Sequence, residues 1–357
     1  MAVYTTIDDP SVHFQSALYT GNGSTQSITN DGNSDLQPDL LWIKSRSDSS
    51  FHAWTDSTRG TSKRIYSNST AAEESHTDRV TAFNSDGFSL GSSSLVNTNT
   101  YNYVAWQWKA NGGTTASNSV GDIDSVVQAN TDAGFAIVTY TGNGSANQTI
   151  GHGLGAVPKM ILFKNRSNAA YWYVYHVATG NDTMTYLNLT NAAQSLSSQF
   201  STPTTTTFNV SNENSTFSGY NTSGNTYVAY VFAEVQGYSK FGKYTGSGGT
   251  GVTAPFVYTG FKPAFVLFKK SSDSGDNWMM YDNKRSDSNG NVVDRALHPN
   301  SSAAEYDNAN ANLDILSNGF KLRSSFGWVN QNTHTYIYMA FAENPFVTST
   351  GIPATAR

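Results

Sequence analysis

The chain has 357 residues, enough for two or three domains, and only 13% of them are charged, against roughly 25% in an average globular protein. The net charge is −5 and no polybasic run occurs, so we expect neither nucleic acid nor a membrane as a partner. The absence of cysteine excludes disulfides and thiolate metal sites. The N-terminal sequence MAVYTTIDDPSVHF lacks the basic and apolar regions of a signal peptide. We therefore expect a protein made in the cytoplasm without an export signal.

The first third of the chain carries a series of landmarks. A turn sequence, YTGNGS, begins at Tyr19, and a proline followed by an apolar strand that ends in lysine occupies Pro38–Lys44. The segment NSTAAE begins at Asn68, the triplet DGF begins at Asp86, and an aromatic strand, YVAWQWKA, closes the series at residues 103–110. Glycine, asparagine and serine separate these segments, as is typical of short strands joined by turns.

Three of these landmarks return twice in the same order. The turn recurs at Tyr140 and Tyr244, and the proline strand recurs at residues 158–164 and 263–269. The closing strand recurs as YVAYVFAE at residues 227–234 and as YIYMAFAE at residues 336–343. A period of more than one hundred residues is far longer than that of solenoids or propeller blades. We therefore expect each repeat to be a domain that owns a core rather than sharing one.

The landmarks place the domain boundaries. We expect the first domain over residues 1–110 with an N-terminal arm, the second over 134–235 and the third over 236–346. Residues 111–133 are polar and rich in glycine and are predicted to be a linker, and residues 347–357 are predicted to be a tail. Because the arm over residues 1–13 has no counterpart in the other repeats, we expect the arm or the tail to dock on another copy of the chain, in a homo-oligomer.

The periodicity within each repeat is that of β-strands. Every second residue of the closing strands is apolar in all three repeats, as a core-facing strand requires, and we expect Trp108, Phe232 and Phe341 to be buried. Turn residues every eight to twelve positions are typical of antiparallel sandwiches. The sequence predicts an all-β protein of three tandem antiparallel β-sandwich domains, of the jelly-roll kind.

Residues that could carry catalysis or hold a metal are scattered along the chain. The seven histidines show no metal-binding spacing, no nucleophile-elbow or phosphate-loop motif occurs, and no two carboxylates are placed for glycoside hydrolysis. The loop Ser272–Asn277 is the best candidate for Ca²⁺ but matches no full ligand pattern. We expect no enzymatic activity, no cofactor and no bound metal.

One polar pattern is shared by two of the repeats. Asp56 and Arg59 lie three residues apart, and Asp282 and Arg285 reproduce the pattern in the third repeat. The second repeat has His176 in the position of the acid and lacks the arginine. Such a pair either fixes a loop or forms the polar rim of a ligand-binding site.

Aromatic residues supply a second candidate site. Tyr171, Trp172 and Tyr173 are consecutive, so on a strand their rings point to both faces and some must lie outside the core. Exposed rings flanked by Asn, Ser and Thr can pack against another subunit or stack on a sugar. We take these three residues, together with the two Asp–Arg pairs, as the candidate ligand-binding residues.

The landmarks together resemble a repeat domain of tailed-phage virion proteins, especially those of marine phages. The resemblance rests on YTTID, LYTGNG, PDLLWIKSRS, SNSTAAE, FNSDGFSLGSS and YVAWQWKANGG, and it is tightest over residues 1–113. The second repeat departs from it because it lacks the segment corresponding to residues 59–64. Proteins with this domain are described as tail-fibre-like or concanavalin-A/lectin-like, so the resemblance implies a concanavalin-A-like sandwich and a place in the particle.

We therefore expect a virion structural protein, either a tail-fibre or appendage subunit or a decoration of the capsid surface. Its expected partners are other copies of itself, in a trimer by analogy with phage fibres, other virion proteins, and host-surface polysaccharide during host attachment. Such a protein is made in the host cytoplasm and ends in the virion. The alternative is a free carbohydrate-binding adhesin or a glycanase-related lectin module.

Overall fold

The protein is described by a computed structural model that covers residues 4–196, 200–211, 218–286, 291–307 and 310–353. Strands dominate these residues, and every named pair of strands is antiparallel. The helices are short turns, namely α1 (Ser94–Asn97), α2 (Gly327–Asn330), η1 (Pro10–Val12), η2 (Ser218–Tyr220) and η3 (Gly251–Thr253). No helix in the described ranges is long and apolar enough to cross a membrane. The predicted all-β class is confirmed.

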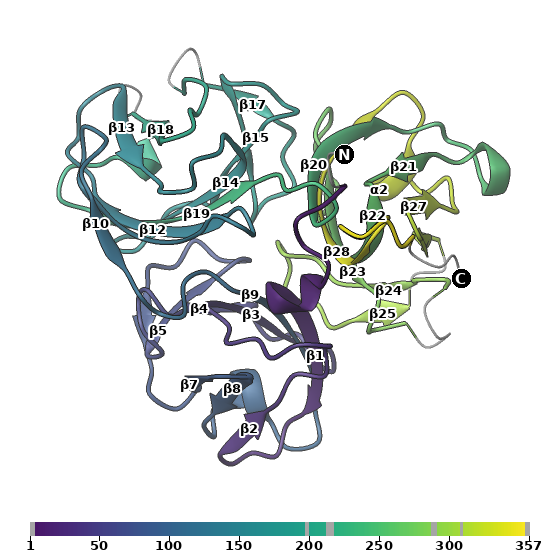
Figure 1. Ribbon diagram of the computed structural model, residues 1–357, viewed down its shortest axis with the longest axis horizontal. Coiled ribbons are helices and arrows are strands. Elements are labelled where there is room, and N and C mark those ends of the chain that lie inside the picture. The colour runs from purple at the N-terminus through teal and green to yellow at the C-terminus, as the bar shows by residue number, and fades with distance from the viewer. Residues whose placement is uncertain (1–3, 197–199, 212–217, 287–290, 308–309, 354–357) are drawn as a thin grey trace.

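Each repeat contributes one large sheet (Figure 1). The first has the order β1-β9-β3-β4-β5-β6, the second β10-β11-β12-β19-β14-β15-β16-β17, and the third β20-β28-β22-β23. The strands of the first sheet are β1 (Phe14–Thr20), β3 (Leu40–Ser45), β4 (Ala53–Asp56), β5 (Lys63–Tyr66), β6 (Glu74–Ser75) and β9 (Asn102–Trp108). Those of the second are β10 (Ala116–Asn118), β11 (Ser125–Asn130), β12 (Phe135–Thr141), β14 (Pro158–Asn165), β15 (Tyr173–His176), β16 (Thr183–Tyr186), β17 (Gln194–Ser195) and β19 (Thr226–Ala233). Those of the third are β20 (Ser239–Thr245), β22 (Phe261–Lys270), β23 (Met279–Asp282) and β28 (Thr335–Pro345).

A small sheet lies on one face of each large sheet. The small sheets are β2 (Gln26–Ile28), β8 (Gly87–Leu90) and β7 (Val80–Asn84); β13 (Gln148–Gly151) and β18 (Thr207–Val210); and β21 (Phe256–Tyr258), β27 (Gly319–Leu322) and β26 (Leu313–Leu316). The third repeat adds the pair β24 (Arg295–Ala296) and β25 (Tyr306–Asp307). Each pair of large and small sheets encloses an apolar cluster, which includes Phe88 in the first repeat, Phe208 in the second and Phe320 in the third.

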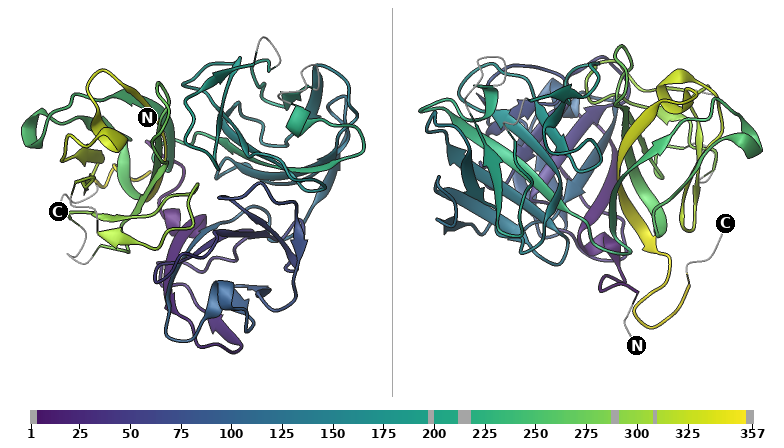
Figure 2. Two further views of the ribbon diagram at one scale, coloured as in Figure 1. Left: turned by 180° about the vertical axis from the view of Figure 1, so that it is seen from behind. Right: turned by 90° about the horizontal axis from the view of Figure 1, so that it is seen from above.

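The other faces of the three large sheets meet at a shared centre. The repeats lie around a common axis, and one continuous apolar cluster contains residues of all three (Figures 1 and 2). Trp108, Phe232 and Phe341 are each 1% exposed, as predicted, and their ring centroids lie 5.6–6.3 Å apart. The expectation that no core is shared is therefore wrong. The large sheets are apolar on both faces, and each face needs its own cover.

Buried asparagines explain why the turn sequence recurs. The side-chain oxygens of Asn97, Asn221 and Asn330 accept hydrogen bonds from the backbone N–H groups of the turns at Asn22, Asn143 and Ser247, at 2.7–3.1 Å. The glycine that follows in each turn has a positive φ of 66–77°, a conformation that favours glycine. One asparagine in each repeat therefore fixes the same turn at the end of β1, β12 and β20.

The predicted linker over residues 111–133 contains two strands of the second sheet, β10 and β11. β10 and β11 pair in register with each other, and β11 pairs with β12 along six residues. The connection to the first repeat is also held firmly, because the buried carboxylate of Asp39 accepts hydrogen bonds from the backbone of Ala110, Gly112 and Gly113 at 2.7–2.9 Å. The polar composition that indicated a linker reflects an edge strand and an anchored turn instead.

The arm docks on the third repeat of its own chain. The Tyr4 hydroxyl donates to Gly260 O at 2.7 Å, the Thr5 hydroxyl donates to Gln236 O at 2.8 Å, and Ile7 enters the shared centre. Asp8 accepts a hydrogen bond from the backbone N–H of Ser349, in the tail, at 2.6 Å. The arm and the described part of the tail are therefore held by contacts within their own chain. These contacts require no neighbouring chain, and the homo-oligomer stays a prediction.

Candidate functional site

Two of the three consecutive aromatic residues are not available to a ligand. Trp172 is fully buried in the shared centre and Tyr173 is 4% exposed in the core of the second repeat. The Trp172 indole N–H donates to the carbonyl of Tyr66, in the first repeat, at 2.7 Å. Tyr171 is 44% exposed and packs edge-on against Tyr186. The expectation of a three-ring binding surface is therefore wrong for Trp172 and Tyr173, because both faces of β15 are covered.

Asp56 and Arg59 form a buried ion pair. β4 ends at Asp56, and the turn that follows brings Arg59 back so that its Nε lies 2.5 Å from Asp56 Oδ2. The other carboxylate oxygen accepts the backbone N–H of Arg59 at 2.9 Å. Both side chains are completely inaccessible to solvent, so the pair cannot be the rim of an open site.

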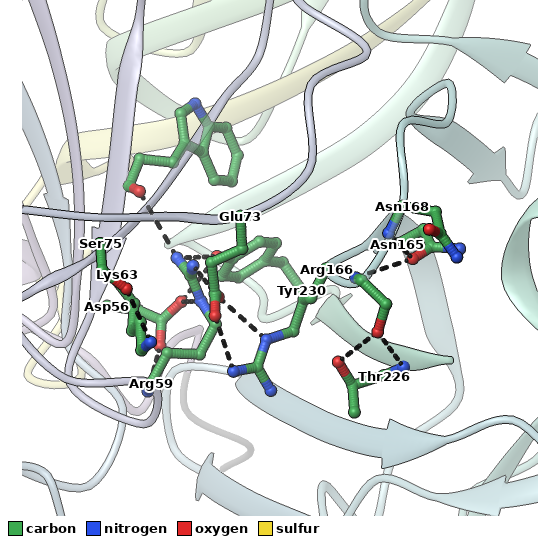
Figure 3. A network of polar contacts seen from close by, with 12 residues as sticks. Asp56, Arg59, Lys63, Glu73, Ser75, Asn165, Arg166, Asn168, Thr226 and Tyr230 are labelled. Carbon is green, nitrogen blue, oxygen red and sulfur yellow. Dashed lines mark hydrogen bonds and ion pairs between the residues drawn. The ribbon is translucent and has the colours of Figure 1, made fainter. Parts of the chain in front are cut away.

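Glu73 of the first repeat, with Arg166 and Tyr230 of the second, completes this cluster (Figure 3). Glu73 accepts from Arg59 Nη1 at 2.8 Å and from two nitrogens of Arg166 at 2.9 and 3.0 Å. The Tyr230 hydroxyl donates to Asp56 Oδ2 at 2.6 Å and accepts from Arg59 Nη2 at 3.1 Å. We call these five residues the first charged seam, because they join the first repeat to the second.

The charges of this seam stabilise one another. Burial by itself lowers the pKa of Arg59, but Asp56, Tyr230 and Glu73 outweigh burial and raise it. Burial by itself raises the pKa of Glu73, but hydrogen bonds and charge from Arg166 and Arg59 outweigh it and lower that pKa. Burial raises the pKa of the Tyr230 hydroxyl. Glu73 and Arg59 therefore keep their charges near neutral pH. This suits a permanent structural contact rather than proton transfer.

A second charged seam joins the third repeat to the first. Arg285 Nε lies 2.6 Å from Asp282 Oδ2, and Arg285 Nη1 lies 2.9 Å from Glu305 Oε2. From the first repeat, Arg46 donates to Glu305 at 2.6 Å and the Trp106 indole N–H donates to Asp282 at 2.9 Å. The Arg285 guanidinium also lies over the Trp106 ring, 5.4 Å from its centroid. These five residues occupy the positions of the first charged seam.

The seam between the second and third repeats has no charge at these five positions. Its backbone contact is the same, since Ala193 N–H donates to Ser271 O at 2.9 Å, as Glu73 N–H does to Arg166 O at 2.9 Å. The Nε2 of His176 donates to the carbonyl of Tyr338, in the third repeat, at 3.0 Å, and burial lowers the pKa of His176 to about 4. We call this the neutral seam, and its five positions hold His176, Thr179, Ala193, Ser271 and Met339.

The three repeats around their shared centre form a ring, and one family model covers nearly all of it. The model of a family described as a domain of unknown function, DUF7483, matches residues 9–345. The chain belongs to this family. The match spans all three repeats, so the DUF7483 domain corresponds to the complete ring rather than to a single repeat. Comparisons with curated proteins and with solved structures found no match.

Sequence reasoning found only the Asp–Arg half of each charged seam in the DUF7483 chain. It missed Glu73, Arg166 and Tyr230 in the first seam, and Glu305, Arg46 and Trp106 in the second. A signal existed, because Glu73 and Glu305 end two similar segments, NSTAAE at residues 68–73 and NSSAAE at residues 300–305. The arginines follow the proline strands by two residues. This signal could not be interpreted from the sequence, since each glutamate contacts an arginine of a different repeat.

Three buried lysines are the other titratable set. Lys44, Lys164 and Lys269 end the three proline strands, and each donates to at least one backbone carbonyl at 2.6–2.9 Å. Burial lowers the pKa of Lys164 to about 7 and those of Lys44 and Lys269 to about 8. One such lysine per repeat indicates a role in the fold. Within the described ranges, no three His, Asp or Glu side chains lie close enough to hold a metal ion.

Proposed function

We propose that this DUF7483 chain is a structural protein of a tailed-phage particle, in which three jelly-roll, concanavalin-A-like sandwich domains form one rigid, trimer-like block. The single observation that carries the proposal is the closed ring with its shared aromatic centre. Tail fibres and capsid decorations are commonly trimeric, and a chain that folds as its own trimer offers threefold geometry without assembly. The resemblance of the repeats to virion domains supports the same role.

The chemistry of the seams fits this role better than catalysis. The buried charges of the two charged seams in the DUF7483 ring form networks that join repeats through Arg166–Glu73 and Arg46–Glu305, so they add rigidity and orientation. The three equivalent turns at the ends of β1, β12 and β20 carry only Gly, Asn, Ser and Thr. We propose that these three turns contact the host surface or a neighbouring virion protein, with the arm and tail at the opposite end of the molecule (Figure 2).

The location of the protein tests this proposal. Particles are purified from lysates of the phage that carries the gene, and the protein is sought by mass spectrometry and by gold-labelled antibody in electron micrographs. The expected result is a stoichiometric particle component at a constant position. Recovery of the protein only from the soluble lysate, with none in the particles, would overturn the proposal.

A carbohydrate-binding protein is the second candidate, and one observation favours it. Phe256 and Tyr258 are 44% and 52% exposed and project from the same face of β21. The corresponding β2 position of the first repeat has Ser27 in place of Phe256. Glycan-array binding that is lost in Phe256→Ala and Tyr258→Ala but kept in Ser27→Ala would support this function, whereas a silent array for the intact chain would contradict it.

A further inference from the structure

The edge of the large sheet at β1, β12 and β20 differs among the three repeats. β1, β12 and β20 are equivalent strands, since each leads into the turn that a buried asparagine holds. β12 is covered by β11, whereas β1 and β20 end their sheets. β20 carries Lys240 and Lys243, and exposed lysines are a common protection of edge strands. β1, with the sequence FQSALYT, has no charged residue, proline or glycine. Of these three edges, only that of β1 therefore has neither a strand partner nor a lysine.

The backbone of β1 has a full set of groups directed away from its sheet. Lys109 N–H bonds to His13 O and Gly21 N–H bonds to Tyr101 O, which sets the alternation of the β1–β9 ladder. In an antiparallel pair the intervening residues direct N–H and C=O outward. Phe14, Ser16 and Leu18 therefore present donors and acceptors in the pattern that another antiparallel strand needs.

A groove runs along this edge, between the first and third repeats. It has a volume of about 1020 Å³, and Phe14, Gln15 and Ser16 form part of one wall. The opposite wall includes Asn283 and Lys284, which follow β23 in the third repeat. Cavities of this size hold ligands as large as a short peptide.

Ser16 gives a second, independent sign of a missing partner. It is 5% exposed, and its hydroxyl has no hydrogen-bond partner among the described residues. The equivalent residues of the other repeats are Ile137 and Phe241, which lie in the shared centre. A buried hydroxyl without a partner is unfavourable, so its presence where the other repeats are apolar indicates a polar ligand in the groove.

The second repeat contains the template for that ligand. Gln128 of β11 lies opposite Ile137, and its amide nitrogen donates to the hydroxyls of Ser57 at 2.9 Å and Thr58 at 2.8 Å. In the third repeat the positions of Ser57 and Thr58 are held by Asn283 and Lys284. A strand added to β1 would thus place a polar side chain between Ser16 and this pair, as β11 does between its neighbours.

We propose that the edge of β1 binds an extended segment of another polypeptide, which adds one antiparallel strand to the first sheet. The segment carries a glutamine or glutamate opposite Ser16, directed at Asn283 and Lys284. Backbone hydrogen bonds supply most of the affinity, and the groove selects the side chain. The inference goes beyond the proposed function and does not depend on it.

A peptide copy of the chain's own strand is the probe. An end-blocked peptide of residues 123–132, IDSVVQANTD, is added to the full-length protein, and amide hydrogen exchange is followed by mass spectrometry. We expect exchange over residues 14–20 to slow by about tenfold or more at saturation, and exchange over residues 239–245 to stay unchanged. The Gln128→Glu peptide should bind several-fold more tightly, because its carboxylate can join Asp31 at the Lys284 ammonium.

Two controls keep the test decisive. A Val126→Pro peptide removes a donor that pairs with the edge and should give no protection. The Lys284→Met protein should lose the gain of the glutamate peptide over the glutamine peptide. Absence of protection over residues 14–20 at about 1 mM for both peptides, or equal protection by the proline peptide, would overturn the proposal. So would a glutamate peptide that gains nothing, because the third repeat would then form no wall of the site.

Discussion

The first charged seam and the neutral seam share one backbone geometry and have opposite chemistry. Between the first and second repeats, Asp56, Arg59, Glu73 and Arg166 form a buried network with Tyr230. Between the second and third repeats all five positions are uncharged. No described seam retains half of the network. The comparison teaches that a buried ion network is kept complete or replaced as a whole, because a single remaining charge would be left in the interior without a partner.

The replacement also crosses repeat boundaries. The neutral seam combines His176, Thr179, Ala193 and Ser271, and the last of these belongs to a different repeat from the others. The second repeat nevertheless keeps Arg166, because that residue serves the first charged seam. The charge of each residue therefore follows the seam in which it lies and not the repeat to which it belongs.

Removal of one charge from a charged seam should have the largest effect. Arg59→Met leaves Asp56 buried without its base and Glu73 with Arg166 alone, and we expect the free energy of unfolding to fall by about 3–5 kcal/mol. Urea unfolding followed by tryptophan fluorescence measures it. Arg323→Met, which breaks the exposed pair with Asp314, is the matched control and should cost less than about 1 kcal/mol. Equal losses for the two variants would contradict the structural role of the seam.

Acid should weaken the neutral seam through His176. Its pKa is about 4 in the folded protein, against about 6.5 for a solvent-exposed histidine, so the unfolded chain binds the extra proton between these values. The contribution of neutral His176 is thus complete above pH 6.5 and is lost as the pH falls toward 4, by roughly 3 kcal/mol in total. Unfolding measured from pH 7 to pH 4 should show a shallower decline for His176→Gln than for the native chain. An unchanged slope for His176→Gln would contradict this assignment.

Conversion of the whole first seam should cost less than the single change. The variant Asp56→His, Arg59→Thr, Glu73→Ala, Arg166→Ser and Tyr230→Met reproduces the neutral seam, and we expect a net loss below about 2 kcal/mol because no charge is left unpaired. The same urea titration compares it with Arg59→Met. A loss greater than that of Arg59→Met would mean that the two seams are not interchangeable.

The exposed pair beside the second charged seam should have the smallest effect. Lys284 and Asp31 lie 2.8 Å apart across the same pair of repeats as Arg285, but their side chains are 36% and 69% exposed. Lys284→Ala should therefore lower stability by less than about 1 kcal/mol, and the difference should disappear in about 1 M salt. A large or salt-insensitive loss would show that burial is not what separates the strong contacts from the weak ones.

The fold was more predictable than the site. The alternation of apolar residues correctly predicted that Trp108, Phe232 and Phe341 are buried. The turn sequences between short apolar segments correctly predicted an all-β protein. β11 was missed because Ser125–Asn130 is too polar to indicate a strand until β12 is seen beside it. The Asp–Arg pairs were found from their spacing, but their partners lie up to 176 residues away in the chain.

The sequence by itself determined the repeats, the strands and the two faces of each strand, because these follow from local order and from a side-chain period of two. It did not determine what covers each face. Residues such as Trp106 and Tyr230 satisfied the pattern of a core within one repeat, whereas in the ring they line the contact between repeats. Only the tertiary structure decided which residues cover each face. An apolar pattern predicts that a face is buried, but the residues that cover it come from distant parts of the chain.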